Sequence, residues 1–253
     1  MRDPQEKVIV SYIRTNRVHG VFTECLMDLM MFDFATHRRI VEGGGRLSYE
    51  SGANVSGPRN EVVRKFLDYG KADWLFMVDT DMVFAPDVVE RLLEQADPDT
   101  APIVGGLCFG FNDRGDIVPT MYGLMGEADD PEHLDVTRFE EWPVDTMFQV
   151  VATGAACLLI HRSVFERMRD FEHPNRPGKV GFNDAYPWFQ EVEHDGRPVS
   201  EDIAFCWRAG LLQIPVFVNT AVHIGHIKDR VLNMESYMLA RELLAQAEAG
   251  AEA

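Results

Sequence analysis

Segments of strand length alternate with stretches of helical spacing through the first half of the chain. The predicted strands are Val8–Ile13, Arg46–Glu50, Asp73–Val78 and Ile103–Gly106. Between them, apolar residues recur as on the buried face of a helix over Val21–Arg39, Asn60–Tyr69 and Val88–Gln95, with a turn predicted at Ser56-Gly57-Pro58. The order β-α-β-α-β-α-β predicts helices packed on a largely parallel sheet.

The second half of the chain is less regular. Residues 121–145 are rich in acidic residues and predict a solvated surface segment, whereas Phe171–Pro198, rich in Pro, Gly and aromatic residues, predicts a long ordered loop. The other predicted elements are a strand over Val150–Ile160 with a turn at Thr153-Gly154-Ala155, a short helix capped by Ser163, a helix after Ser200, a strand over Ile214–Val218 and a helix over Met234–Glu248.

The sequence has no feature that would divide it into separate domains. Neither a repeat of fixed period nor a Pro/Ser-rich linker divides the sequence. We therefore expect one domain over residues 1–230, followed by a C-terminal helix and tail over residues 231–253. The expected fold class is α/β: a Rossmann-like three-layer α/β/α sandwich with a mixed, mostly parallel central sheet.

Composition and charge narrow the possible functions. The 253 residues include 24 Lys or Arg and 41 Asp or Glu, a formal charge of −17, which argues against a nucleic-acid partner because that partner requires a positive field. The longest nearly apolar run, Val151–Ile160, is about half of a membrane span. The N-terminus has no signal-peptide core. We expect a soluble, cytoplasmic protein whose four cysteines, free of any C-x-x-C pair, are reduced core thiols.

Asp79-Thr80-Asp81 is the sharpest chemical feature of the sequence. The two carboxylates directly follow an apolar strand, at the edge where open α/β sheets bind ligands. Carboxylates two residues apart in an extended segment point to one side, so both could address one hard cation. Asp is also common in a turn after a strand. The motif alone therefore leaves a metal site and a structural turn as alternatives.

The other polar motifs have structural explanations of their own. Ser200-Glu201-Asp202 is typical of a helix start, with Ser as N-cap and acids in the first turn. His223 and His226 follow a strand, where single histidines are often structural. The glycines at residues 43–45 lack the Lys-Ser/Thr of a phosphate-binding loop, and no G-x-S-x-G or H-E-x-x-H occurs.

The order of these segments resembles the GT-A-fold glycosyltransferases, in particular the family-2-like enzymes of phage and bacterial genomes. ADWLFMVDTDMVFAPD resembles the D-x-D segment, VATGAACLLIHRSVFE the T-G segment, SEDIAFCWRAG the E-D helix and NTAVHIGHI the late Gly-His metal motif. Pro58-Arg59-Asn60 resembles the Arg-Asn pair near the donor. Departures are the acidic insert at 127–145 and Asn219, where an acid is expected. The resemblance spans Val8 to about Lys228.

The resemblance implies a metal-dependent glycosyltransferase of the hexosyltransferase type, cytoplasmic in a bacterium or phage-infected host. Its donor would be a nucleotide-diphosphate sugar, contacted by Asp79, Arg59 and Asn60, and its acceptor a glycan or protein. Asp81 would bind Mn²⁺ or Mg²⁺ directly and His226 would complete the protein ligands, while Asp79 would reach the ribose or, through water, the ion. An imidazole beside carboxylates suits Mn²⁺ somewhat better than Mg²⁺.

The resemblance also implies the catalytic residues. Asp202 would act as general base on an acceptor hydroxyl and give inversion, and Glu201 would orient the acceptor. Trp188 and Phe189 could stack on a sugar face, although aromatic residues beside Pro more often pack a loop. Two other functions remain open: a non-catalytic nucleotide- or glycan-binding domain, and a metal-dependent nucleotidyltransferase, which usually has a Lys-bearing glycine loop near its N-terminus.

Overall fold

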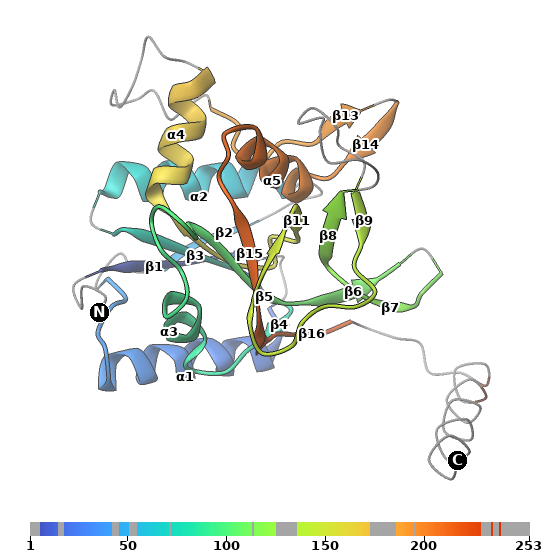
Figure 1. Ribbon diagram of the computed structural model, residues 1–253. Helices are drawn as coiled ribbons and strands as arrows, with labels where there is room; N and C mark the ends of the chain where they lie inside the picture. Colours follow the sequence, from blue (N-terminus) through green and yellow to red (C-terminus); the bar gives the residue numbers. More distant parts are fainter. Residues whose placement is uncertain are drawn as a thin grey trace.

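A seven-stranded sheet lies at the centre of the protein (Figure 1). The computed structural model describes residues 6–14, 18–41, 46–50, 55–70, 72–112, 114–124, 136–172, 186–194 and 196–228, with Met234 and Met238. In spatial order the strands are β10 (Met147–Val150), β15 (Val216–His223), β5 (Ile103–Leu107), β12 (Cys157–His161), β3 (Trp74–Asp79), β1 (Val8–Arg14) and β2 (Arg46–Glu50). Only β10 and β12 run antiparallel to the others, so the predicted mixed, mostly parallel sheet is confirmed.

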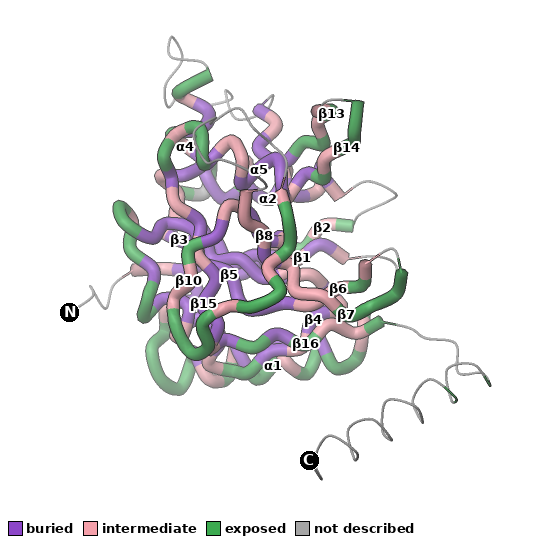
Figure 2. The backbone as a smooth tube through the Cα atoms, turned by 45° about the vertical axis from the view of Figure 1, so that its right-hand side comes forward, coloured by how far each residue is buried: buried purple, intermediate pink, exposed green. Residues whose placement is uncertain are grey.

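Helices cover both faces of this sheet, which gives the predicted three layers. On one face lie α1 (Gly20–Ala35) and α3 (Val88–Leu93), and on the other lie α2 (Ser56–Tyr69), α4 (Arg162–Glu172) and α5 (Glu201–Leu211). Alternate strand residues supply the two cores: Trp74 and Phe76 point into the first, and Leu75 and Met77 into the second. Figure 2 shows the resulting buried centre.

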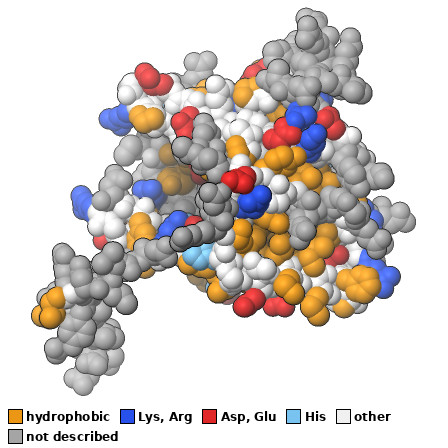
Figure 3. Space-filling model, turned by 180° about the vertical axis from the view of Figure 1, so that it is seen from behind, with side chains coloured by type: hydrophobic (Ala, Val, Ile, Leu, Met, Phe, Trp, Pro, Cys, Tyr) orange, Lys and Arg blue, Asp and Glu red, His pale blue; other side chains and the backbone are white. Residues whose placement is uncertain are grey.

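The outer side of α1 is also apolar. Met27, Met31 and Phe34 are exposed there, while Phe22 and Leu29 are buried against the sheet. Figure 3 shows hydrophobic side chains along the lower edge of the molecule, the edge that α1 occupies in Figure 1. This helix is therefore apolar around most of its circumference rather than amphipathic.

Several local predictions differ from the structure. Ser56-Gly57-Pro58 is the first turn of α2 rather than a separate turn, because Pro fits a helix start. The segment expected to be solvated contains β8 (Met121–Leu124) and β9 (Val136–Arg138), which pair with each other. Residues 125–135 lie outside the described residues, and Glu140, Glu141 and Asp145 are exposed, as expected of a solvated segment.

Short strands complete the fold between and after the core elements. They are β4 (Met82–Val83), β6 (Phe109–Phe111), β7 (Ile117–Pro119), β11 (Ala152–Thr153), β13 (Val192–His194), β14 (Arg197–Val199) and β16 (Gly225–His226). The β13–β14 hairpin lies in the segment predicted as a loop. The predicted strand over Val150–Ile160 is split into the end of β10, β11 and β12.

The cysteines and the C-terminal segment complete this comparison. All four cysteines are free; Cys108, Cys157 and Cys206 are buried, as expected, whereas Cys25 is only partly so. Burial raises the pKa of Cys157 and of Cys206 to about 12, so both remain thiols. The predicted helix over 234–248 lies outside the described residues apart from Met234 and Met238, which are helical and exposed. None of the described helices has the length and apolar character needed to cross a membrane.

Candidate functional site

The Asp79-Thr80-Asp81 motif lies where β3 leaves the sheet. Asp79 is the last residue of β3, Thr80 and Asp81 form a turn, and β4 follows at once. Because the turn interrupts the extended backbone, the two carboxylates do not share one set of partners: Asp79 bonds Arg59, and Asp81 bonds His226. The expectation that both carboxylates address one cation therefore stays a prediction.

Arg59 connects three elements of the site. It lies in the first turn of α2 and is only 4% exposed. Its Nη2 donates to Oδ1 and Oδ2 of Asp79 at 3.2 and 3.1 Å, and its Nη1 donates to Oε1 of Glu201, the first residue of α5. Burial opposes the charge of Arg59, but the charges of Asp79 and Glu201 outweigh burial and hold its pKa above the ordinary value. Arg59 therefore fixes these two carboxylates relative to each other.

The carboxylates around Arg59 are crowded. Burial raises the pKa of Asp79; Arg59 opposes this shift and the charge of Asp81 adds to it. Burial also raises the pKa of Glu201, again against Arg59 and with the charge of Asp202 adding to it. Four carboxylates thus influence one another around a single buried guanidinium, an arrangement that favours the approach of a further cation.

Asp81 and His226 face each other across the β4–β16 pair. His226 is paired with Met82, and its Nε2 lies 3.0 Å from Oδ2 of Asp81. Its Nδ1 lies 2.7 Å from the carbonyl oxygen of Phe109, which can only accept, so Nδ1 carries the hydrogen. Nζ of Lys228 also donates to Oδ2 of Asp81 at 3.1 Å. Burial of Asp81 opposes ionisation, but the hydrogen bond and charge of His226, together with Lys228, hold its pKa below the ordinary value.

This pair has the chemistry of a partial metal site. With the hydrogen on Nδ1, Nε2 of the neutral His226 ring carries a lone pair that faces a carboxylate oxygen, and either a proton on Nε2 or a cation bound by both acceptors satisfies this contact. An imidazole whose other nitrogen is fixed by a carbonyl is the usual arrangement of a metal-bound His. Within the described ranges, however, no group of three His, Cys, Asp or Glu residues could hold an ion, so Asp79 is not assembled with Asp81 and His226 as expected. A metal-binding role of Asp81 and His226 stays a prediction.

Asp202 lies one residue into α5, beside the Thr153-Gly154-Ala155 segment. Its Oδ1 accepts hydrogen bonds from Oγ of Ser200 and from the backbone N–H of Ile203. A Cβ placed on Gly154 would lie 3.6 Å from Oδ2 of Asp202, so the missing side chain leaves this oxygen open on that side. The T-G and E-D motifs are thus neighbours, although they are far apart in the sequence.

Asn60 and the aromatic residues beside Pro187 have structural partners. Nδ2 of Asn60 donates to the carbonyl oxygen of Phe189 at 2.7 Å, and its Oδ1 accepts from the N–H of Phe189 at 2.8 Å. Trp188 and Phe189 are both 0% exposed, and the Phe189 ring stacks on Phe205. The expectation that Trp188 and Phe189 stack on a sugar is therefore wrong, and loop packing is confirmed. A contact of Asn60 with the donor stays a prediction.

Two other residues singled out by the motifs lie apart from this cluster. Asn219, where an acid was expected, is buried; its Nδ2 donates to the carbonyl oxygen of Arg91 at 3.3 Å and its Oδ1 accepts from the N–H of Ala221 at 3.1 Å. These bonds give Asn219 a role in holding β15 against α3. His223 is exposed at the end of β15, whereas His226 faces Asp81.

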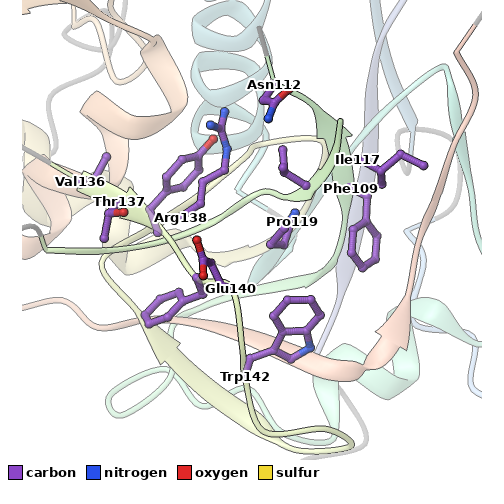
Figure 4. A pocket seen from close by; sticks show the side chains of 12 residues that line it. Phe109, Asn112, Ile117, Pro119, Val136, Thr137, Arg138, Glu140 and Trp142 are labelled. Carbon is purple, nitrogen blue, oxygen red and sulfur yellow. The ribbon is translucent and has the colours of Figure 1, made fainter. Parts of the chain in front are cut away.

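Sequence reasoning missed a cavity of about 600 Å³ formed by the insert between β5 and β12. Its walls include Phe109, Tyr122, Phe139 and Trp142, and Figure 4 shows Arg138 and Glu140 among the side chains that line it. The acidic composition of the segment concealed its aromatic residues. Their clustering at both ends of the acidic run was the available signal, but their convergence depends on the tertiary pairing of β6–β7 and β8–β9.

Comparisons with known proteins bear on the fold. No family model and no curated protein matches the sequence. Protein A197 from STIV aligns over 88% of this chain and 86% of its own, at 14% identity and a TM-score of 0.47. GalNAc-T7, crystallised with UDP, GalNAc and Mn²⁺, aligns over 88% of this chain and 44% of its own, at 10% identity and a TM-score of 0.54. This chain thus spans less than half of GalNAc-T7, and the likeness confirms the expected GT-A fold.

Proposed function

We propose that this protein is a metal-dependent glycosyltransferase that moves a sugar from a nucleotide-diphosphate sugar to an acceptor hydroxyl, with inversion. The observation that carries the proposal is the meeting of four separated motifs at one edge of the sheet. Arg59 joins Asp79 to Glu201, His226 faces Asp81, and Gly154 lies against Asp202. The carboxyl ends of the parallel strands are where ligands bind in open α/β sheets.

The donor would bind at the Asp79–Asp81 turn. Asp81 and His226 would hold a divalent cation, Mn²⁺ in preference to Mg²⁺ because of the imidazole, and the donor phosphates and water would supply the remaining ligands. When bound, the ion would stabilise the charge that develops on the leaving diphosphate. The presence of UDP, GalNAc and Mn²⁺ in GalNAc-T7 supports this assignment. Asp79, held by Arg59, would contact the ribose or reach the ion through water.

The protein's own part in the transfer is to remove a proton. Asp202 would accept the proton of the acceptor hydroxyl while that oxygen bonds to the anomeric carbon. The bond from this carbon to the diphosphate oxygen breaks at the same time, and the nucleoside diphosphate leaves with the electron pair. A single in-line displacement of this kind inverts the anomeric centre. Glu201, fixed by Arg59, would orient the acceptor and the first turn of α5.

Product analysis tests the proposal against its alternatives. The full chain is incubated with Mn²⁺ and a panel of UDP-, GDP- and dTDP-sugars, with and without simple glycosides, and separately with nucleoside triphosphates and sugar 1-phosphates. A glycosyltransferase releases nucleoside diphosphate, slowly by hydrolysis without an acceptor and faster with one. A nucleotidyltransferase instead releases pyrophosphate from nucleoside triphosphates and sugar phosphates, and a binding domain releases nothing. Either of the last two results would contradict the proposal.

A further inference from the structure

The cavity in the insert between β5 and β12 has a mixed apolar and polar lining. All of its lining residues lie between Phe109 and Trp142, so it belongs to the variable part of the chain and to none of the strands β1, β2 and β3. Its volume of about 600 Å³ lies within the range of small-molecule sites, roughly 300–1,000 Å³. The space is therefore large enough for a small organic ligand.

Flat apolar surfaces form much of the wall. The rings of Phe109 and Trp142 lie 6.1 Å apart at an interplanar angle of 57°, and the guanidinium of Arg138 lies 5.3 Å from the centre of the Tyr122 ring. Such faces suit a ligand with flat C–H surfaces. Figure 4 shows Trp142 and Phe109 on one side of the cavity, with Arg138 and Glu140 beside its middle.

The polar groups of the cavity favour a neutral ligand with hydroxyl groups. Arg138 supplies donors and Glu140 supplies acceptors. The amide of Asn112, by contrast, is engaged with Arg114 and Asp116 in the turn between β6 and β7. One basic and one acidic side chain balance each other, so the lining has no excess positive charge for a phosphate. Aromatic faces combined with planar hydrogen-bonding groups match a saccharide ring, which has C–H faces and a rim of hydroxyls.

The cavity lies close to Asp202. A Cβ on Gly154 would lie 3.5 Å from Oγ1 of Thr120 and 3.6 Å from Oδ2 of Asp202, so Thr120 and Asp202 flank the same glycine. Thr120 directly follows Pro119, which lines the cavity. Burial raises the pKa of Tyr122, and the charge of Asp202 adds to this shift, which places the ring within electrostatic reach of that carboxylate.

We infer that this cavity binds the acceptor as a neutral saccharide, stacked on Trp142 and hydrogen-bonded by Arg138 and Glu140, with a hydroxyl directed toward Asp202. The inference rests on the proposed function and names the chemistry of its acceptor. The other contact of the cavity with the site is Phe109, whose carbonyl oxygen orients His226. Phe109 would therefore contact the acceptor and also orient His226, one of the two residues proposed to hold the cation.

Binding of simple glycosides tests the inference without a donor. The full-length protein is titrated by calorimetry with methyl glycosides of glucose, galactose, N-acetylglucosamine and N-acetylgalactosamine. At least one should bind, and Trp142→Ala should weaken it by about fivefold, since an aromatic contact of this kind contributes roughly one kcal/mol. Arg138→Met should weaken it as well. The control is Phe34→Ala, which removes a 64% exposed ring from α1 and should change nothing.

Donor hydrolysis in the absence of acceptor separates this inference from the proposed function. Trp142→Ala should hydrolyse donor at the wild-type rate, and a marked loss in the folded variant would show that the cavity serves the donor and overturn the inference. No glycoside binding, or binding unchanged in both Trp142→Ala and Arg138→Met, would also overturn it. Glycoside binding that needs Trp142, in a protein that consumes no donor, would support the cavity and contradict the proposed function.

Discussion

The chemistry proposed here depends at the residue scale on Asp202. Asp202→Asn keeps the size of the side chain and the oxygen that accepts from Ser200 and Ile203, but the amide cannot take a proton. We expect donor and metal binding to be retained and turnover to fall by about 10²–10⁴-fold, the usual effect of losing a general base. Calorimetric donor binding and product formation on the same preparation measure both.

The helix-start explanation of Ser200-Glu201-Asp202 gives a different outcome for that variant. If Asp202 only supports the first turn of α5, Asp202→Asn should lose at most about 1 kcal/mol of stability and keep its turnover. A folded variant that binds donor and turns over normally would therefore exclude Asp202 as the base. Glu201 would be the next residue to replace.

His226 and His223 provide a test variant and a matched control for the proposed metal site. His226→Ala removes one of the two proposed ligands of the ion. Loss of a residue that only supports a ligand already lowers metal affinity by roughly 10–100-fold, so we expect His226→Ala to lower Mn²⁺ affinity by at least that much. His223→Ala should leave affinity unchanged, because His223 is exposed at the end of β15. Titration of Mn²⁺ into both variants, followed by its paramagnetic resonance signal, measures the difference. An equal loss in the two variants would contradict the assignment.

The sequence predicted which residues belong to this site better than it predicted which of them contact one another. The motifs located Asp79, Asp81, Asp202 and His226, because strand ends and helix starts place polar groups at the sheet edge. They did not predict that Arg59 engages Asp79, because the turn at Thr80 and the approach of α2 are tertiary features. The aromatic cavity was missed for the same reason.

At the scale of elements, Arg59 ties α2, β3 and α5 together. Arg59→Met should destabilise the fold by about 3–5 kcal/mol, because the buried Glu201 and the partly buried Asp79 would be left without a positive partner. Chemical denaturation measures this loss. Arg14→Met is the control: its pair with Glu50, at 3.4 Å, is well exposed and contributes about 0–1 kcal/mol.

The destabilisation in Arg59→Met should also depend on pH. Arg59 lowers the pKa of both carboxylates against burial, so its removal raises their pKa values further in the folded state. The folded variant then binds these protons more tightly than the unfolded chain, and its stability falls as pH rises through the raised pKa values. The difference from wild type should be smaller near pH 5 than near pH 8. A difference independent of pH would contradict this account.

The end of β15 reaches the site through a close approach to β5. A Cβ on Gly106 would lie 2.6 Å from Cγ1 of Ile224 and 3.2 Å from the carbonyl oxygen of Val222. Gly106→Ala should therefore cost about 1–3 kcal/mol of stability and weaken Mn²⁺ binding, because Ile224 precedes Gly225-His226. Denaturation and Mn²⁺ titration test both effects. Gly20→Ala, with open space around its Cβ, is the control.

The elements themselves followed from the sequence to different degrees. Up to β5 the elements were predicted in order apart from the two-residue β4, because buried parallel strands and the helices between them have strong periodic patterns. The insert between β5 and β12 was not, since β6, β7, β8 and β9 have only three or four residues each. Strands this short carry too few residues to show an alternation, and their pairing depends on contacts distant in sequence.

At the scale of the whole molecule, the charge of −17 acts on every ion that approaches the site. The negative field attracts Mn²⁺, and salt screens it: the Debye length falls from roughly 20 Å at about 0.02 M NaCl to roughly 4 Å at about 0.5 M. We expect the apparent Kd of Mn²⁺ to rise over this range. Tetramethylammonium chloride should act as NaCl does, because its bulky cation screens charge but cannot occupy the space between Asp81 and His226. A Kd that stays constant in both salts would mean that Mn²⁺ binding depends on the local pair alone.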